Sequence, residues 1–586
     1  MLRPLTTACR QGHLLDGLWD FAFETGASEN YRNGFVPQKS VPVPSSVNDL
    51  FVSDRERLHS DGMWYQKKFY VDNAHRHDTV VIYFAGASYR SEVYCNGQLI
   101  TRHEGGYLPF TADITTAINW TGENILTVRL DNQLSNETIP QGNLSLEGDN
   151  WIFNSQLPRV PFDFFPYAGI QRSVHLCYLP KSRIDEVKVE THLISDTAAT
   201  VKIYGKIHGN ADSISLKLND EDYQIFIDNE AFSFNVNIEN PRLWDIGCGN
   251  LYPFELCLYD NQMNDNSHSS RVKQLIDHYH SRLGIREIAV RGNQLLLNKH
   301  QIYLQGFGKH EDFFISGKGN NNAVNVRDFE LMQWINANSF RTSHYPYAEE
   351  LLDLADEYGI LVISETPAVS LNTDQATGKT LQTHMTMLEE LIARDYNHPS
   401  VIMWSVANEP RSHQESSRDY FKPLAELTKK LDKTRPNTLV SCWAPDCHAL
   451  QWFDVVSINT YPGWYLLPGN IPEAVKFARE HLSAIHEKFA GPLIVTEFGA
   501  DTLPGYHALP AEMWSEEYQS ELLIELIEAF RSLDFVAGEH IWNFADFRTA
   551  QHHIRAGGNK KGLFTRDRQP KMAAHLVRKK WQETTK

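Results

Sequence analysis

The sequence is 586 residues long, with 42% hydrophobic and 22% charged residues, which is typical of a globular protein of about three domains. Its 55 basic and 73 acidic side chains give a formal net charge of −18, which disfavours nucleic acid or an anionic membrane as a partner. No apolar stretch approaches the roughly 18 residues of a spanning helix, and residues 1–21 lack the apolar core of a signal peptide, so we expect a cytoplasmic protein.

Residues 1–180 are predicted to form a β-sandwich. The segments 78–86 (DTVVIYFAG) and 123–132 (ENILTVRLDN) have the composition of strands, and Asn96-Gly97 is a typical hairpin turn between two further strands. Residues 181–281 contain a second set of strands with few helical signals, among them 186–194 (EVKVETHLI) and 199–209 (ATVKIYGKIHG). This pattern predicts an immunoglobulin-like sandwich.

From residue 282 to 586 the pattern changes, because short apolar runs now alternate with amphipathic helical segments. We predict eight strands at 303–308, 338–346, 359–367, 401–410, 438–443, 454–462, 492–499 and 538–547. Eight strands that alternate with helices over about 300 residues predict a (β/α)8 barrel.

Two of the predicted barrel strands end on a carboxylate. Within VIMWSVANEP (401–410) the apolar run ends on Asn408 and Glu409, before Pro410, and within PLIVTEFG (492–499) it ends on Glu497. Active sites of such barrels lie at the carboxyl ends of the strands, so both side chains should face one mouth. A pair of carboxylates in that place is typical of glycoside hydrolysis. The alternative is that one glutamate only forms a structural ion pair.

Several longer segments extend this pattern over essentially the whole chain. They are DFFPYAGIQRSV (163–174), GFGKHED (306–312), RTSHYPYAEELLDLADEYGI (341–360), IARDYNHPSVIMWSVANEP (392–410), WNFADF (542–547) and GGNKKGLFTRDRQPK (557–571). In this order they resemble glycoside hydrolase family 2, and within it the bacterial-type β-glucuronidases. The resemblance implies that the first sandwich is a sugar-binding-like jelly roll.

The resemblance also implies the catalytic roles. Glu409 would be the acid/base and Glu497 the nucleophile of a retaining double displacement. Asn408 would bind the sugar 2-hydroxyl. Arg341 and Tyr461 would orient the nucleophile and keep it ionised.

Further positions would recognise the sugar. His344 and Asp163 would approach its hydroxyls, and Trp542 would lie under its ring, although each has an alternative as a packing or ion-pair residue. Asp163 comes from the first sandwich, which would make that domain part of the pocket.

A glucuronide differs from neutral glycosides by its carboxylate. The resemblance implies that Asn559 and Lys561, in the order Asn-x-Lys, bind this group together with Arg555 and Tyr465. By composition alone, the same glycine-rich loop would be solvated surface.

The sequence indicates no metal or organic cofactor. HEDFF (310–314) has Phe314 where a zinc-protease helix needs a second histidine, and GFGKHE lacks the third glycine of a dinucleotide fingerprint. Seven cysteines without a C-x-x-C pair predict reduced thiols.

We therefore expect an exo-acting enzyme on small-molecule glucuronides, which the resemblance implies is a homotetramer. Two alternatives stay open: an enzyme that also accepts β-galacturonides, and an inactive carbohydrate-binding homologue.

Overall fold

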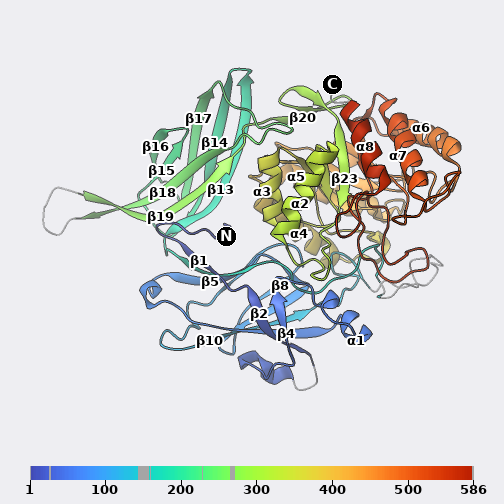
Figure 1. Ribbon diagram of the computed structural model, residues 1–586. Helices are drawn as coiled ribbons and strands as arrows, with labels where there is room; N and C mark the ends of the chain where they lie inside the picture. Colours follow the sequence, from blue (N-terminus) through green and yellow to red (C-terminus); the bar gives the residue numbers. More distant parts are fainter. Residues whose placement is uncertain are drawn as a thin grey trace.

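The computed structural model describes residues 2–24, 28–142, 158, 160–227, 229–263 and 271–583. Two β-sandwiches and a closed barrel follow one another along the chain (Figure 1). The predicted fold class is confirmed. Within the described residues, no helix has the length and apolarity needed to cross a membrane.

The first sandwich has two main antiparallel sheets. One sheet has the order β1-β12-β5-β9, with β1 (Gln11–Leu14), β12 (Val174–Leu179), β5 (Thr79–Phe84) and β9 (Phe110–Asp113). The other has the order β3-β2-β4-β10-β7-β8, with β3 (Lys39–Val43), β2 (Gly17–Phe23), β4 (Gly62–Phe69), β10 (Asn124–Asp131), β7 (Arg90–Cys95) and β8 (Gln98–Glu104). β6 (Ala87–Ser88) pairs with β11 (Gly169–Ile170), and the short helix α1 spans Asp54–Arg57. Large apolar side chains such as Trp19, Phe21 and Tyr65 fill the space between the sheets.

The second sandwich packs a three-stranded sheet on a four-stranded one. The first has the order β13-β14-β17, with β13 (Arg183–Ser195), β14 (Ala198–His208) and β17 (Ala231–Glu239). The second has the order β16-β15-β18-β19, with β16 (Glu221–Phe226), β15 (Ser213–Leu218), β18 (Tyr252–Met263) and β19 (Arg271–Leu283). In β17 buried and exposed residues alternate strictly, as expected for a strand with one face in a core and one in water.

Eight parallel strands close the barrel in chain order. They are β23 (Leu304–Lys309), β24 (Ser339–Thr342), β25 (Leu361–Glu365), β26 (Val401–Asn408), β27 (Asn437–Ser441), β28 (Val455–Asn459), β29 (Leu493–Glu497) and β30 (Val536–Ile541). All eight fall on predicted strands. A small sheet of β20 (Ile288–Arg291), β21 (Gln294–Leu297) and β22 (His300–Ile302) precedes them.

Helices follow seven of the eight barrel strands. They are α2 (Asn322–Ile335), α3 (Glu349–Tyr358), α4 (Gly378–Asp395), α5 (Ser416–Leu431), α6 (Ile471–Lys488), α7 (Glu516–Arg531) and α8 (Met572–Glu583). After β27 the chain forms only the 3-10 helix Leu450–Trp452 before β28. The barrel therefore lacks one of its eight covering α-helices.

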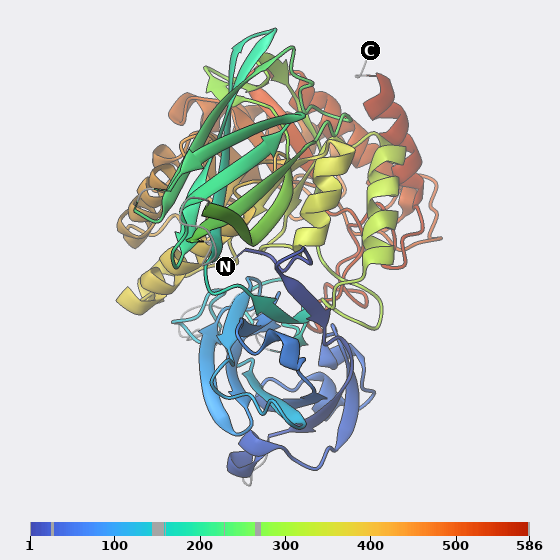
Figure 2. The ribbon, with the colours of Figure 1, turned by 90° about the vertical axis from the view of Figure 1, so that its left-hand side faces the viewer.

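The start of the chain ties the three parts together. Arg3 pairs with Asp353 of α3 at 2.5 Å, and Arg10 pairs with Asp277 of β19 at 2.6 Å with both side chains buried. Both views of the ribbon show the first sandwich against one side of the barrel and the second sandwich against another (Figures 1 and 2).

The first sandwich docks on loops that follow barrel strands. Arg172 donates to Glu311 at 3.0 Å beyond the end of β23, and Arg566, beyond β30, donates to Asp49 at 2.8 Å. Because these loops leave the carboxyl ends of the strands, the contact brings the segment around Asp163 to the mouth of the barrel.

Candidate active site

The backbone turns sharply where β26 ends. All eight residues of this strand are buried, and Glu409 is the first residue after it. Glu409 has a φ of +46°, in the left-handed region that costs a residue with a Cβ about 1–2 kcal/mol. Pro410 has no N–H with which to continue the sheet. Such local strain is concentrated at functional sites, and here it places the carboxylate beyond the strand end.

Glu409 lies in an environment that favours its protonated form. Burial raises the pKa of its carboxyl to about 8, and the negative charge of Glu497 adds to the effect. Asn459, the last residue of β28, donates from Nδ2 to Glu409 Oε1 at 2.8 Å. A carboxyl with this pKa holds a proton at neutral pH, as a general acid must.

Glu497 ends β29 and has different partners. Arg341 Nη2 donates to its Oε1 at 2.5 Å, and the Tyr461 hydroxyl donates to its Oε2 at 2.5 Å. Burial raises the pKa of Glu497, while Arg341 and Tyr461 act in the opposite direction. Glu497 is paired with the cation of Arg341, whereas Glu409 has only the neutral amide of Asn459. Because a neighbouring cation favours the ionised form of a carboxyl, a proton shared by the two glutamates resides on Glu409.

Arg341 lies between two carboxylates. It is fully buried in β24, and its Nη1 donates to Glu365 at 2.8 and 2.9 Å. Glu365 ends β25 and also accepts from the Ser405 hydroxyl at 2.8 Å. The same Nη1 reaches Asn408 Oδ1 at 3.3 Å. These contacts fix the guanidinium that faces Glu497.

An aromatic wall lies beside this network. Trp542 directly follows β30 and stacks on His344, with ring centroids 4.9 Å apart and planes at 19°. His344 Nδ1 lies 3.0 Å from Glu365 Oε1. Burial lowers the pKa of His344 well below its usual value, and Arg341 adds to the effect, so its imidazole is neutral.

A second group contains the residues predicted to bind a carboxylate. Lys561 is 1% exposed, and its Nζ donates to the Tyr465 hydroxyl at 3.0 Å and to the carboxylate of Asp501. Burial acts to raise the pKa of Asp501, but Lys561 and Arg555 outweigh it and hold that pKa below its usual value.

Asp163 joins this group from the first sandwich. Arg555 Nη2 donates to Asp163 Oδ2 at 2.6 Å and to the Tyr465 hydroxyl at 2.7 Å. Asn559 Nδ2 donates to Asp163 Oδ2 at 2.9 Å. We call the six residues Asp163, Tyr465, Asp501, Arg555, Asn559 and Lys561 the cationic cluster.

The two groups are neighbours. Tyr461 bonds to Glu497, and its ring packs on Tyr465 with centroids 5.1 Å apart. Tyr465 in turn bonds to Lys561 and Arg555 of the cationic cluster. All twelve residues singled out from the sequence therefore belong to one connected site at the mouth of the barrel. It combines a proton donor, a second carboxylate, an aromatic wall and donors suited to an anionic group.

Three residues of the site were not predicted from the sequence: Glu365, Asn459 and Asp501. Glu365 and Asn459 are the last residues of β25 and β28, so the rule that led to Glu409 and Glu497 could have found them. Asp501 lies four residues beyond Glu497, in a loop with no comparable signal.

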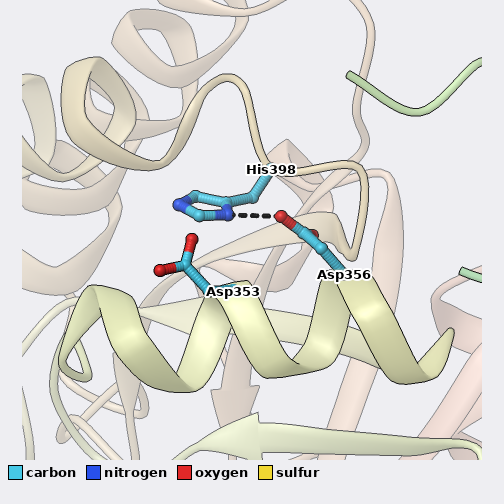
Figure 3. A group of neighbouring side chains, drawn as sticks. All are labelled: Asp353, Asp356 and His398. Atoms are coloured by element: carbon cyan, nitrogen blue, oxygen red, sulfur yellow. Dashed lines mark hydrogen bonds and ion pairs between the residues drawn. The ribbon is translucent and has the colours of Figure 1, made fainter. Parts of the chain in front are cut away.

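A separate group of possible metal ligands lies at α3 (Figure 3). Among the described residues, Asp353, Asp356 and His398 place their ligand atoms within 4.8 Å of one another. His398 Nδ1 is 2.6 Å from Asp356, the other oxygen of Asp356 accepts from the Ser400 N–H at 3.0 Å, and Asp353 pairs with Arg3. With these partners the group is an ion-pair network that anchors α3.

Comparison with known proteins agrees along the whole chain. Residues 13–180 match the sugar binding domain of glycosyl hydrolases family 2, residues 181–286 match glycosyl hydrolases family 2, and residues 288–585 match its TIM barrel domain. A β-glucuronidase of Paenibacillus borealis is 39% identical over 599 residues, which cover 100% of this chain and 99% of that protein. The human β-glucuronidase is 36% identical, and the alignment covers 99% of this chain and 92% of that protein.

Solved structures are similar as well. A β-glucuronidase of an uncultured Clostridium species has a TM-score of 0.91 and 39% identity, covering 100% of both chains. A Ruminococcus gnavus β-glucuronidase in complex with D-glucuronic acid has a TM-score of 0.90 and 37% identity, covering 99% of both chains. The chain is a glycosidase and belongs to glycoside hydrolase family 2.

Proposed function

We propose that the protein is a retaining exo-β-glucuronidase, which hydrolyses β-D-glucuronides to D-glucuronic acid and an alcohol. The observation that carries the proposal is the position of the buried cations Lys561 and Arg555 beside two carboxylates in unlike environments. The carboxylates supply the chemistry of a glycosidase, and the cations supply the preference for an anionic sugar.

In the first step the protonated Glu409 gives its proton to the glycosidic oxygen while Glu497 attacks the anomeric carbon. The bond to the leaving group breaks, and an ester between the sugar and Glu497 forms. In the second step the ionised Glu409 takes a proton from water, whose oxygen replaces Glu497 at the same carbon. Arg341 and Tyr461 stabilise the departing carboxylate of Glu497.

The sugar ring is bound by residues around this pair. Asn408 faces the 2-hydroxyl, where a contact strengthens as the transition state forms. His344 and Asp163 approach the other hydroxyls, and Trp542 packs against the ring. The neutral imidazole of His344 can accept or donate a hydrogen bond.

The carboxylate at C5 is bound by the four hydrogen-bond donors of the cationic cluster. Lys561 and Arg555 give charge-assisted hydrogen bonds, which are about twice as strong as neutral ones, and Asn559 and Tyr465 add neutral donors. A neutral sugar offers no anion to accept these charge-assisted bonds, so we expect the site to discriminate strongly against neutral glycosides.

The relatives support this reading, because the similar proteins are β-glucuronidases and one of them was solved with D-glucuronic acid. By the same family resemblance we propose a homotetramer that acts on small-molecule glucuronides. The cytoplasmic location and the independence from a metal or organic cofactor expected from the sequence stay predictions.

A panel of nitrophenyl β-glycosides that differ only at C5 tests the proposal. Glucuronide should be hydrolysed with a kcat/KM at least about 10²-fold above glucoside. Comparable rates on both would refute it, and no turnover of any member would favour an inactive carbohydrate-binding homologue. Nitrophenyl galacturonide in the same panel tests whether the C4 epimer is also accepted.

A further inference from the structure

Asp501 is a buried carboxylate of the cationic cluster and contacts both of its cations. Its side chain is fully buried. It accepts from Lys561 Nζ, from Arg555 Nη1 at 3.4 Å and from the backbone N–H of Lys560 at 2.7 Å. One carboxylate thus contacts two side chains and the backbone of the loop between Asn559 and Lys561.

These contacts determine where Lys561 can place its charge. A lysine side chain is a flexible stem with a point charge at its end, so its ammonium needs a fixed acceptor to hold one position. Its other hydrogen-bonding partner, Tyr465, is 45% exposed, whereas Asp501 is held by the backbone bond from Lys560. Asp501 is therefore the partner that holds the Lys561 ammonium in one position.

The charges of the cluster balance before any sugar is bound. Lys561 and Arg555 carry two positive charges, and Asp163 and Asp501 carry two negative ones. Recognition of a carboxylate in a balanced cluster depends on where the donors point, because there is no excess positive charge. The residue that orients the donors then controls selectivity.

We propose that Asp501 is a positioning residue for uronate recognition, which holds Lys561 and Arg555 in place for the carboxylate at C5. This inference rests on the proposed glucuronidase function. It assigns Asp501 no contact with the reacting atoms, so its effect should be much larger on substrates that carry the carboxylate.

Asp501→Asn is the test variant. An amide has one oxygen and one NH2 group, so it cannot accept both from the Lys560 N–H and from the two cations. With nitrophenyl glucuronide, KM should rise on the order of tenfold to hundredfold, which corresponds to the loss of one charge-assisted hydrogen bond. The kcat should change less than about threefold, since the carboxylate contact is made in both ground and transition states. With nitrophenyl glucoside, kcat/KM should fall much less than with nitrophenyl glucuronide.

Asp546→Asn is the matched control. Asp546 is buried in the loop after β30, where it accepts from Lys571 Nζ at 2.8 Å and from the Gly562 N–H at 3.1 Å. It should lower the melting temperature like Asp501→Asn, without a selective rise in the KM for glucuronide. Equal KM values in the two variants, or an equal loss of kcat/KM on glucuronide and glucoside in Asp501→Asn, would overturn the proposal.

A double variant keeps the test decisive if Asp501→Asn does not fold. Asp501→Asn with Lys561→Met removes both charges of this ion pair, which is better tolerated than leaving one buried charge unpaired. Its kcat/KM on glucuronide should equal that of Lys561→Met alone within about threefold. A further loss above tenfold would contradict action through Lys561. Failure of the proposed function is distinct from both results, since the unmodified protein would then show no preference for glucuronide.

Discussion

The raised pKa of Glu409 predicts the alkaline limit of activity. Burial and Glu497 raise this pKa to about 8, and the group must be protonated to assist the leaving group. The pH dependence of kcat/KM reports ionisations of the free enzyme. We therefore expect kcat/KM on nitrophenyl glucuronide to fall about tenfold per pH unit above about pH 8.

Asn459→Ala should move this limit upward. The amide of Asn459 donates to Glu409 at 2.8 Å and lowers its pKa, because the bond favours the ionised form. A hydrogen bond to a charged group contributes about 1.5–3 kcal/mol, and one pKa unit corresponds to about 1.4 kcal/mol. The alkaline limb should therefore shift up by about one to two units.

The assay is the pH profile of kcat/KM for both proteins, with dinitrophenyl glucuronide and Glu409→Gln as the control that lacks the limb. A wild-type limb below about pH 6.5, or a shift to lower pH in Asn459→Ala, would refute the assignment of the limb to Glu409.

Three other predictions follow from the site and the fold. Glu409→Ala should be rescued by azide on substrates with a good leaving group, whereas Glu497→Ala should be inactive on all aryl glucuronides; equal behaviour would reverse or remove the assigned roles. Lys561→Ala should lower kcat/KM on glucuronide by about 10²–10³-fold. Lys560→Ala should change it little, because the Lys560 ammonium lies 3.7 Å from Asp546. Near-normal activity of Lys561→Ala would place the carboxylate site elsewhere. Arg10→Met, which leaves a buried carboxylate unpaired, should lower the free energy of denaturant unfolding by about 3–5 kcal/mol, and a change below about 1 kcal/mol would contradict the coupling of the chain start to the second sandwich.

Much of the fold could be predicted from local patterns. Each barrel strand is a short run of buried apolar residues, such as the fully buried β26, and such runs between amphipathic helices are visible without tertiary contacts. The eightfold alternation of strands and helices did not predict that the chain after β27 forms only the 3-10 helix Leu450–Trp452.

In the site, too, residues at strand ends could be predicted from local patterns, whereas those held by long-range contacts could not. Glu409 and Glu497 stand at strand ends, so the topology of a barrel is enough to bring them together. Asp163 and Arg555 are 392 positions apart, and no local signal pairs them; the family resemblance assigned each to the pocket but did not predict their contact. Asp501 could not be found because its role depends on three donors from a distant loop. Such contacts exist only once the barrel has folded.

The anomeric configuration of the first-formed product tests the central claim most directly. Proton NMR of nitrophenyl β-glucuronide during early turnover should show β-glucuronic acid before mutarotation produces the α-anomer, as two displacements at one carbon require. First formation of the α-anomer would contradict a nucleophilic Glu497, and the absence of turnover would contradict the glucuronidase function itself.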